Sequence, residues 1–256
     1  MRQFGILVKN ELFMLFVSPA TYVTTVLFHL LTASFYILIL ADYTDIPSED
    51  IPMVVFFRLF WTVALFVAPL LTMRSISEER RLGTLQTLMT TPTTTTQFVL
   101  SKFFSVYALY MLLWLSTLLY PVLVSIAVPG LGQQIPLLDP ATIVGGFLFL
   151  SLSGLLIISV GIFSSSITRS VMVAAIFSFT LLFFIIASGG LIEKLADNMP
   201  GRIDFLDGPA EYLRMFQHLE DFIHGILDTR PFVYYITGAG VFLALSTIIV
   251  DAKVDS

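Results

Sequence analysis

Six long apolar stretches constrain what this chain can fold into. They cover approximately residues 20–41, 54–73, 99–127, 141–166, 170–192 and 232–250. About 20 mainly apolar residues are needed to cross roughly 30 Å of hydrocarbon as a helix, and each stretch meets that length. The stretches are continuous and do not alternate polar with apolar residues, as the strands of a membrane β-barrel would. The sequence therefore predicts an all-α polytopic membrane protein with six transmembrane helices in one domain that occupies residues 1–256.

The composition agrees with this prediction and excludes several other classes. Of the 256 residues, 57% are hydrophobic and 12% are charged, whereas a soluble domain has about 25% charged residues. The 13 basic and 18 acidic residues give a net charge of −5 without a Lys/Arg-rich run, so nucleic-acid binding is not expected. The chain has no cysteine, which excludes disulfides, thiol nucleophiles and cysteine-ligated metals.

Single residues mark some of the span boundaries. Asp139-Pro140 opens the fourth span as an N-cap followed by proline. Pro121 gives the third span a place to kink, and Arg169 lies in a connection so short that spans four and five must form a hairpin. Small residues that permit close helix packing recur along the fourth span: Ser151, Gly154, Gly161 and Ser165.

The basic residues set the predicted orientation. An even number of spans places both termini on one side, and eight bases fall there: Arg2, Lys9, Arg74, Arg80, Arg81, Lys102, Arg169 and Lys253. The opposite side has five, mostly in one long loop: Arg58, Lys194, Arg202, Arg214 and Arg230. Its short loops, 42–53 and 128–140, contain no base. The positive-inside rule then predicts that both termini are cytoplasmic.

Residues 1–17 precede the first span. Their apolar residues recur at helical spacing, which predicts an amphipathic helix in the cytoplasmic interface that bends into the first span. A plain extension of the span is the alternative. We do not expect a cleaved signal peptide, because the apolar run is long and no small-x-small cleavage site precedes Asp42.

The cytoplasmic connection 74–98 contains a charged quartet, Glu78-Glu79-Arg80-Arg81, followed by Gly83. Apolar residues then recur at helical spacing, which predicts a short helix over 77–90 that ends at Thr91-Pro92. Such a helix suits docking of a cytoplasmic partner. It also suits a loop helix on lipid headgroups, and spacing alone favours that second interpretation.

The outer loop 193–231 ends in an amphipathic segment, which predicts an interfacial or bundle-capping helix before the sixth span. Its apolar face is expected to consist of Tyr212, Phe216, Leu219, Ile223 and Ile226.

Chemistry-bearing motifs are absent from the sequence. It contains no phosphate-binding loop, dinucleotide fingerprint, zinc-protease motif or nucleophile elbow, so no catalytic residue, metal or cofactor is expected in this chain. His218 and His224 lie beside Glu220 and Asp221, but a spacing of six places the two histidines on different helix faces. A wet interfacial face is favoured over a metal site.

Polar residues within the spans point to structural contacts. His29 in the first span is expected to make an inter-helix hydrogen bond, and Arg58 lies close enough to the outer end of its span to snorkel. The spans contain no chain of Asp and Glu residues that an ion-coupled carrier would use. If the protein transports something actively, another subunit supplies the energy.

Four segments of the chain resemble a known protein family. The stretch APLLTMRSISEERRLGTLQTLMTTPTTTTQFVLSKF, residues 68–103, is similar to permeases of ABC-2 type transporters, in particular the gliding-motility (Gld-type) branch. SPATYV at 18–23, GIFSSSITRSVMVAAI at 161–176 and HGILDTRPFVYY at 224–235 are similar as well. The threonine run after Pro92 departs from the commoner pattern and leaves the end of the predicted helix open.

The resemblance implies a bacterial inner-membrane exporter subunit without its own ATPase site. It would pair with a second permease copy or paralogue and dock cytoplasmic ABC ATPase subunits, which bind ATP and Mg. The N-terminal helix would be the elbow helix, and 74–98 would hold the coupling helix seated in the ATPase. The residues carried over to that helix are Glu78, Glu79, Arg80, Arg81, Gly83 and Thr84.

Other functions stay open at this level. A non-transporting scaffold could transmit ATPase-driven movement to an extracytoplasmic partner at 193–231. A channel or carrier acting alone is disfavoured by the lack of charges within the spans, and an intramembrane enzyme by the lack of a nucleophile–base pair. The sequence names no substrate beyond the compatibility of its apolar surface with membrane lipid, and it does not decide between homodimer and heterodimer.

Overall fold

The computed structural model describes residues 2–45, 51–84, 93–128, 137, 139–198, 214–226 and 228–254. These residues form helices and short connections, and no strand occurs among them. Six helical segments of the described chain are long and apolar enough to cross a membrane: Pro19–Tyr43, Phe60–Leu82, Thr95–Ala127, Pro140–Ile167, Val171–Ser188 and Thr229–Lys253. The prediction of an all-α fold with six candidate spans is therefore confirmed.

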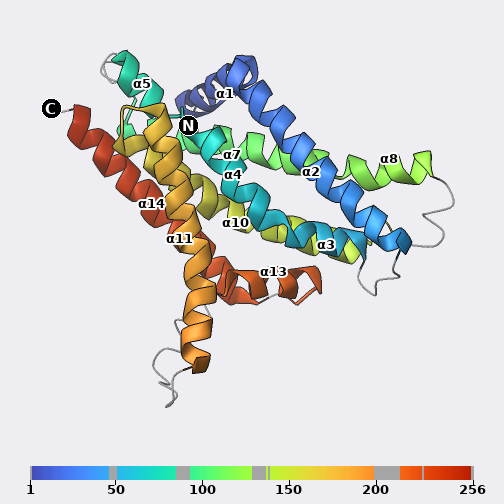
Figure 1. Cartoon of the computed structure of the whole chain (residues 1–256). Helices are drawn as coiled ribbons and strands as arrows, with labels where there is room; N and C mark the ends of the chain where they lie inside the picture. Colours follow the sequence, from blue (N-terminus) through green and yellow to red (C-terminus); the bar gives the residue numbers. More distant parts are fainter. Residues whose placement is uncertain are drawn as a thin grey trace.

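The described helices are arranged along one bundle (Figure 1). They are α1 (Arg2–Val17), α2 (Pro19–Asp45), α3 (Pro52–Arg58), α4 (Phe60–Thr72), α5 (Ser77–Leu82), α7 (Thr95–Ser116), α8 (Leu119–Ala127), α10 (Pro140–Ile167), α11 (Val171–Asn198), α13 (Met215–Ile223) and α14 (Thr229–Val254). One end of the bundle, the α5 end, holds α1, α5 and the C-terminal turns of α14. Helix α13 lies at the opposite end, the α13 end.

Helix α10 forms the centre of the bundle. It contacts α14, α11, α13, α7, α4, α3 and α5 and is the most deeply buried of the six candidate spans. Its small residues let these neighbours approach, as predicted. A Cβ atom at Gly154 would overlap the ring of Tyr110, and one at Gly161 would overlap Thr72. Ser151 Oγ lies 2.7 Å from the hydroxyl of Tyr107. Small residues therefore position α4 and α7 against α10.

Both ends of α10 have local signals that the sequence reveals. The Asp139 carboxylate accepts hydrogen bonds from the backbone N–H of Thr142 at 2.8 Å and from its hydroxyl at 2.7 Å. These two bonds favour the charged form and hold the pKa of Asp139 below its ordinary value. At the other end only residues 168–170 separate α10 from α11, so the two helices form the expected hairpin.

The third span bends where proline removes a donor. Pro121 lacks the N–H that would bond to the carbonyl of Thr117, and α7 ends at Ser116 while α8 begins at Leu119. The backbone N–H of Tyr120 donates to Thr117 O instead, at 3.0 Å. The expected kink is therefore present, and it lies one turn before the proline.

The second expected span, 54–73, is divided into α3 and α4 at Leu59, whose ψ of −5° interrupts the helix. Arg58 lies at this break and, besides the predicted extension of its side chain toward water, forms an ion pair. Its Nε lies 2.6 Å from Glu220 Oε1 and its Nη2 lies 3.1 Å from Glu220 Oε2, which makes a two-pronged ion pair. The pair fastens α3 to α13 at the α13 end.

The predicted apolar face of the outer helix is wrong in part. Helix α13 buries Met215, His218, Leu219, Phe222 and Ile223, which recur at positions i, i+3, i+4, i+7 and i+8. Two residues assigned to that face, Phe216 and Ile226, are 50% and 59% exposed, and Tyr212 lies outside the described residues.

Two neighbours turn α13 away from the predicted face. The backbone of Phe222 lies against Gly145 of α10, and the buried imidazole of His218 packs edge-on against the Tyr235 ring. The expectation of a wet face at His218 is therefore corrected. The predicted inter-helix hydrogen bond of His29 in the first span is confirmed, because His29 Nε2 lies 2.8 Å from Ser116 Oγ.

Candidate functional site

Helix α5 begins after a tight turn and is anchored at its start by α10. Residues 73–76 form turns between α4 and α5. The hydroxyl of Ser165 on α10 accepts hydrogen bonds from the backbone N–H groups of Ile76 and Ser77, both at 3.0 Å. It donates its own proton to the carbonyl of Met73 at 3.2 Å. The first N–H groups of a helix have no acceptor within the helix, so the Ser165 hydroxyl of α10 supplies the acceptor that the start of α5 lacks.

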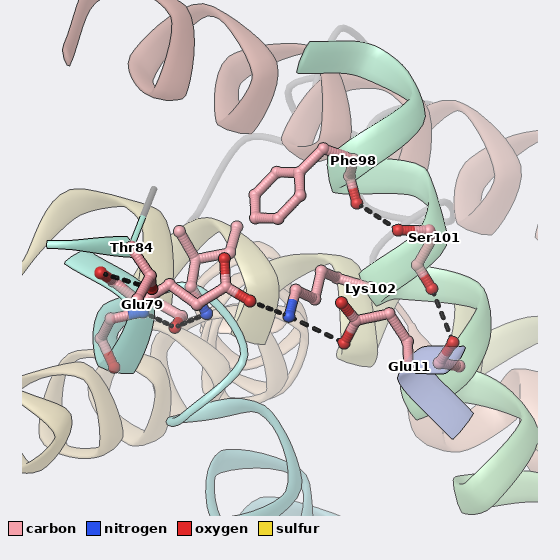
Figure 2. Close-up of polar contacts among 10 residues, drawn as sticks. Glu11, Glu79, Thr84, Phe98, Ser101 and Lys102 are labelled. Atoms are coloured by element: carbon pink, nitrogen blue, oxygen red, sulfur yellow. Dashed lines mark hydrogen bonds and ion pairs between the residues drawn. The ribbon is translucent and has the colours of Figure 1, made fainter. Parts of the chain in front are cut away.

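A buried charge cluster fastens the other side of α5. Lys102 on α7 pairs with Glu79 of α5 and, at 2.7 Å, with Glu11 of α1 (Figure 2). The lysine side chain is 9% exposed, and the two carboxylates are 18% and 19% exposed. The Lys102 ammonium also lies 5.4 Å from the centroid of the Phe98 ring. One cation between two carboxylates leaves the cluster with one negative charge in excess.

Helix α1 is held to α7 next to this cluster. The hydroxyl of Ser105 donates to the carbonyl of Val8 at 3.1 Å, and α1 and α7 pack against each other. The Glu11–Lys102–Glu79 cluster therefore joins three helices that are far apart in sequence.

Two cations cap the C-terminal end of α10. Arg80 Nη1 donates to the carbonyl of Ser166 at 2.6 Å, and Lys253 Nζ donates to the carbonyl of Ile167 at 2.8 Å. The last carbonyls of a helix carry partial negative charge and have no partner within the helix, so cations from α5 and α14 satisfy them. Arg80 thereby adds a second connection between α5 and α10.

The remaining predicted site residues face outward. Arg81, Gly83 and Thr84 are exposed, and Arg81 Nη2 lies 3.4 Å from Glu78 Oε1 within the same helix. Gly83 has φ of 73° and ends α5 in the left-handed conformation, which costs an L-residue with a side chain about 1–2 kcal/mol. The structure therefore separates Glu79 and Arg80, which bind other helices of this chain, from Glu78, Arg81, Gly83 and Thr84 at the surface.

The predicted helix over 77–90 is shorter in the structure. Helix α5 ends at Leu82 because Gly83 reverses the backbone there, whereas the prediction continued the periodicity through the glycine. Residues 85–92, including Thr91-Pro92, lie outside the described residues.

Sequence reasoning missed Glu11, Lys102 and Ser165 as parts of this site. Lys102 could have been found, because a lysine within an expected span requires a partner or access to water. Glu11 and Glu79 were candidate partners, because residues 1–17 and 74–98 are both predicted on the cytoplasmic side. Ser165 gave no comparable signal, because buried serines in a helix ordinarily bond to their own backbone.

The family model of the ABC-2 family transporter protein matches residues 47–250, which is most of the chain and runs from α3 into α14. The chain belongs to the ABC-2 transporter family. No curated protein matched the chain in the comparison.

Membership gives the chain a role as the membrane permease subunit of an ABC transporter. In this family the membrane component is not itself the ATPase, so partnership with a cytoplasmic ABC ATPase and with a second permease is implied for this ABC-2 protein. The described residues contain no group of His, Asp and Glu that could hold a metal ion.

Proposed function

We propose that this ABC-2 permease is an exporter subunit whose α5 transmits movement from a cytoplasmic ABC ATPase to the membrane helices. ATP and Mg would bind to the ATPase subunit, and the permease would function as a pair, either two copies or a copy and a paralogue. The observation that carries the proposal is the attachment of one short helix, α5, to α1, α7 and α10, while Arg81 on the same helix is exposed.

These attachments make α5 suitable for transmitting force. Ser165 and Arg80 bind α5 to α10, and the Glu11–Lys102–Glu79 cluster binds it to α7 and α1. Packed elements move as rigid bodies, so a displacement of α5 would be passed at once to two candidate spans, α7 and α10, and to the interfacial helix α1. The outward-facing Glu78 and Arg81 would then contact the ATPase through charge-assisted hydrogen bonds.

The orientation that this proposal needs is supported by charge. Arg74 precedes α5, and Arg80 and Arg81 lie in it. Arg169 lines a pocket with Arg81, and Lys253 caps the end of α10 beside Arg80. This gathering of bases supports a cytoplasmic placement of the α5 end under the positive-inside rule. An inner-membrane location with cytoplasmic termini, and the assignment of α1 as the elbow helix, belong to the proposal. The narrower relation to the gliding-motility branch stays a prediction.

The alternative of a non-transporting scaffold needs an outer partner at 193–231. Within that segment the described helix α13 turns its apolar face inward, against α10 and α3. That face is therefore in use within the chain, which favours an exporter. A structure of the full complex would separate the two functions, since an exporter requires a path between two permeases and a force transmitter does not.

The docking proposal is tested with a charge exchange that leaves the internal contacts intact. We expect the double variant Glu78→Arg with Arg81→Glu, co-expressed with its ABC ATPase, to lose co-purification of the ATPase and stimulated ATP turnover. The exchange keeps the net charge and the ion pair within α5, but it reverses the positions of the two charges that α5 presents to the ATPase. The matched control is Arg58→Glu with Glu220→Arg at the α13 end, which should assemble normally. Unchanged assembly of the α5 variant would contradict the proposal.

A further inference from the structure

A cavity of about 760 Å³ lies beside the Glu11–Lys102–Glu79 cluster. Residues of α1, α2, α4, α5 and α7 line it. Ser18, at the junction between α1 and α2, is one of its lining residues, and Glu78, Glu79 and Leu82 of α5 form another part of its wall. Its volume is within the range of about 300–1,000 Å³ that is typical of small-molecule sites.

The polarity of the lining is graded along α1. Asn10 and Glu11 lie at the end near α5, whereas Met14 and Val17 follow toward α2. The same change occurs between α5 and α4, where Glu78 and Glu79 give way to Leu70 and Leu71. A cavity that is charged at one end and apolar at the other matches an amphiphile. The headgroup of such a ligand would lie beside α5.

The charges of the lining restrict the headgroup. Lys102 is already flanked by two carboxylates, so it is not available for a phosphate. Arg74 is exposed, and no described residue forms an ion pair or hydrogen bond with its guanidinium. Arg74 can therefore receive a phosphate, since a guanidinium binds phosphate oxygens in two-pronged geometry.

The carboxylates of the lining favour a second, cationic group. Glu78 lines the cavity, and its contact with Arg81 at 3.4 Å is exposed and therefore weak. The buried cluster beside it carries one negative charge in excess. A ligand that brings an ammonium group next to its phosphate would neutralise both ends of the polar region.

We propose that this cavity binds a phospholipid whose headgroup joins a phosphate to a primary ammonium, as in phosphatidylethanolamine. Arg74 binds the phosphate, Glu78 receives the ammonium, and the upper part of one acyl chain lies along Met14, Val17 and Leu70. Because Glu11, Glu79 and Lys102 form one wall, the lipid contacts the same cluster that holds α5 to α1 and α7. Glu78 borders both this cavity and the outer side of α5, so the lipid and the ATPase would share that carboxylate, but lipid retention by the purified chain requires neither export nor a docked ATPase.

The test measures which lipid the protein retains. The full chain is purified in detergent, exchanged into an equimolar mixture of phosphatidylethanolamine and phosphatidylglycerol with identical acyl chains, and washed. Bound lipid is then counted by mass spectrometry. We expect phosphatidylethanolamine to be enriched about fivefold, as one exposed charge pair allows. Equal retention of both lipids by the unmodified protein, or preference for phosphatidylglycerol, would overturn the proposal.

Variants locate the bound lipid. Arg74→Gln should remove the retained lipid, Glu78→Gln should reduce the enrichment to about onefold, and Met14→Trp should exclude the lipid by filling the apolar end. Met14 is 61% exposed, so this last change leaves the core intact. The matched control is Arg169→Gln, which removes a base from the α5 end outside this cavity and should retain the lipid normally. Equal losses from Arg74→Gln and Arg169→Gln would mean a nonspecific headgroup layer and would overturn the proposal.

Discussion

At the scale of single residues, Lys102 is the side chain on which the α5 end depends most. It is the cation between Glu79 and Glu11, all three side chains are largely buried, and they come from α5, α1 and α7. A buried charge that loses its partner is costly, whereas a whole buried ionic group can be replaced by neutral side chains at little cost.

This difference makes a prediction about Lys102. Lys102→Met should destabilise the protein by about 3–5 kcal/mol, because two carboxylates are left facing each other without a cation. The triple variant with Glu11→Gln and Glu79→Gln added should recover most of that loss. Thermal unfolding of the purified protein in detergent measures both. A triple variant as unstable as the single one would show that the ammonium group contributes more than charge neutralisation.

The same residues show what sequence reasoning can find. The charged quartet of α5 stands out in the sequence because four consecutive charges lie beside a span, yet two of the four, Glu79 and Arg80, bind other helices of this chain. Which of them do so depends on Ser166 and Lys102, which are distant in sequence and lie on separate helices. Periodicity assigns a residue to a helix face, but only the tertiary arrangement determines what lies opposite that face.

At the scale of helices, the close approach of α13 to α10 positions the α13 end. The carbonyl of Phe222 occupies the space where a side chain at Gly145 would begin, whereas Gly240 on α14 has open space around it. Both glycines lie inside long helices, so they differ mainly in what surrounds them.

This contrast gives a second prediction. Gly145→Ala should destabilise the protein by about 1–3 kcal/mol through overpacking and should loosen α13. Gly240→Ala should be neutral or slightly stabilising, because alanine favours the helix. Limited proteolysis near α13, together with thermal unfolding, measures the effect. Equal behaviour of the two variants would mean that α13 adjusts without cost.

The spans and the kink of the third span followed from the sequence, because apolar length and proline are local signals. The buried face of α13 did not. Its periodicity fits more than one face, and the choice between them was made by Gly145 and Tyr235 on other helices. The break at Leu59 has no residue-type signal in the sequence.

At the scale of the whole molecule, the proposed orientation can be tested by labelling. The chain has no cysteine, so single cysteines can be introduced without background. Thr84→Cys and Gln217→Cys are at exposed positions at opposite ends of the bundle. In intact cells an impermeant maleimide should label Gln217→Cys only, and Thr84→Cys should react only after the membrane is opened. The reverse pattern would contradict the cytoplasmic assignment of the α5 end.

The capping of α10 by Lys253 also has a consequence for biosynthesis. Helix α10 is inserted into the membrane well before α14, yet α14 packs along it and supplies a cation for its last carbonyls. Until α14 has been synthesised, the side of α10 that α14 later covers would therefore face lipid, and the last carbonyl of α10 would lack the Lys253 ammonium. A chain that ends before α14 would leave this side of α10 uncovered. A quality-control protease could therefore distinguish such a chain from one that contains α14. Pulse-chase lifetimes of chains truncated before Thr229, compared with the full chain, would measure this difference.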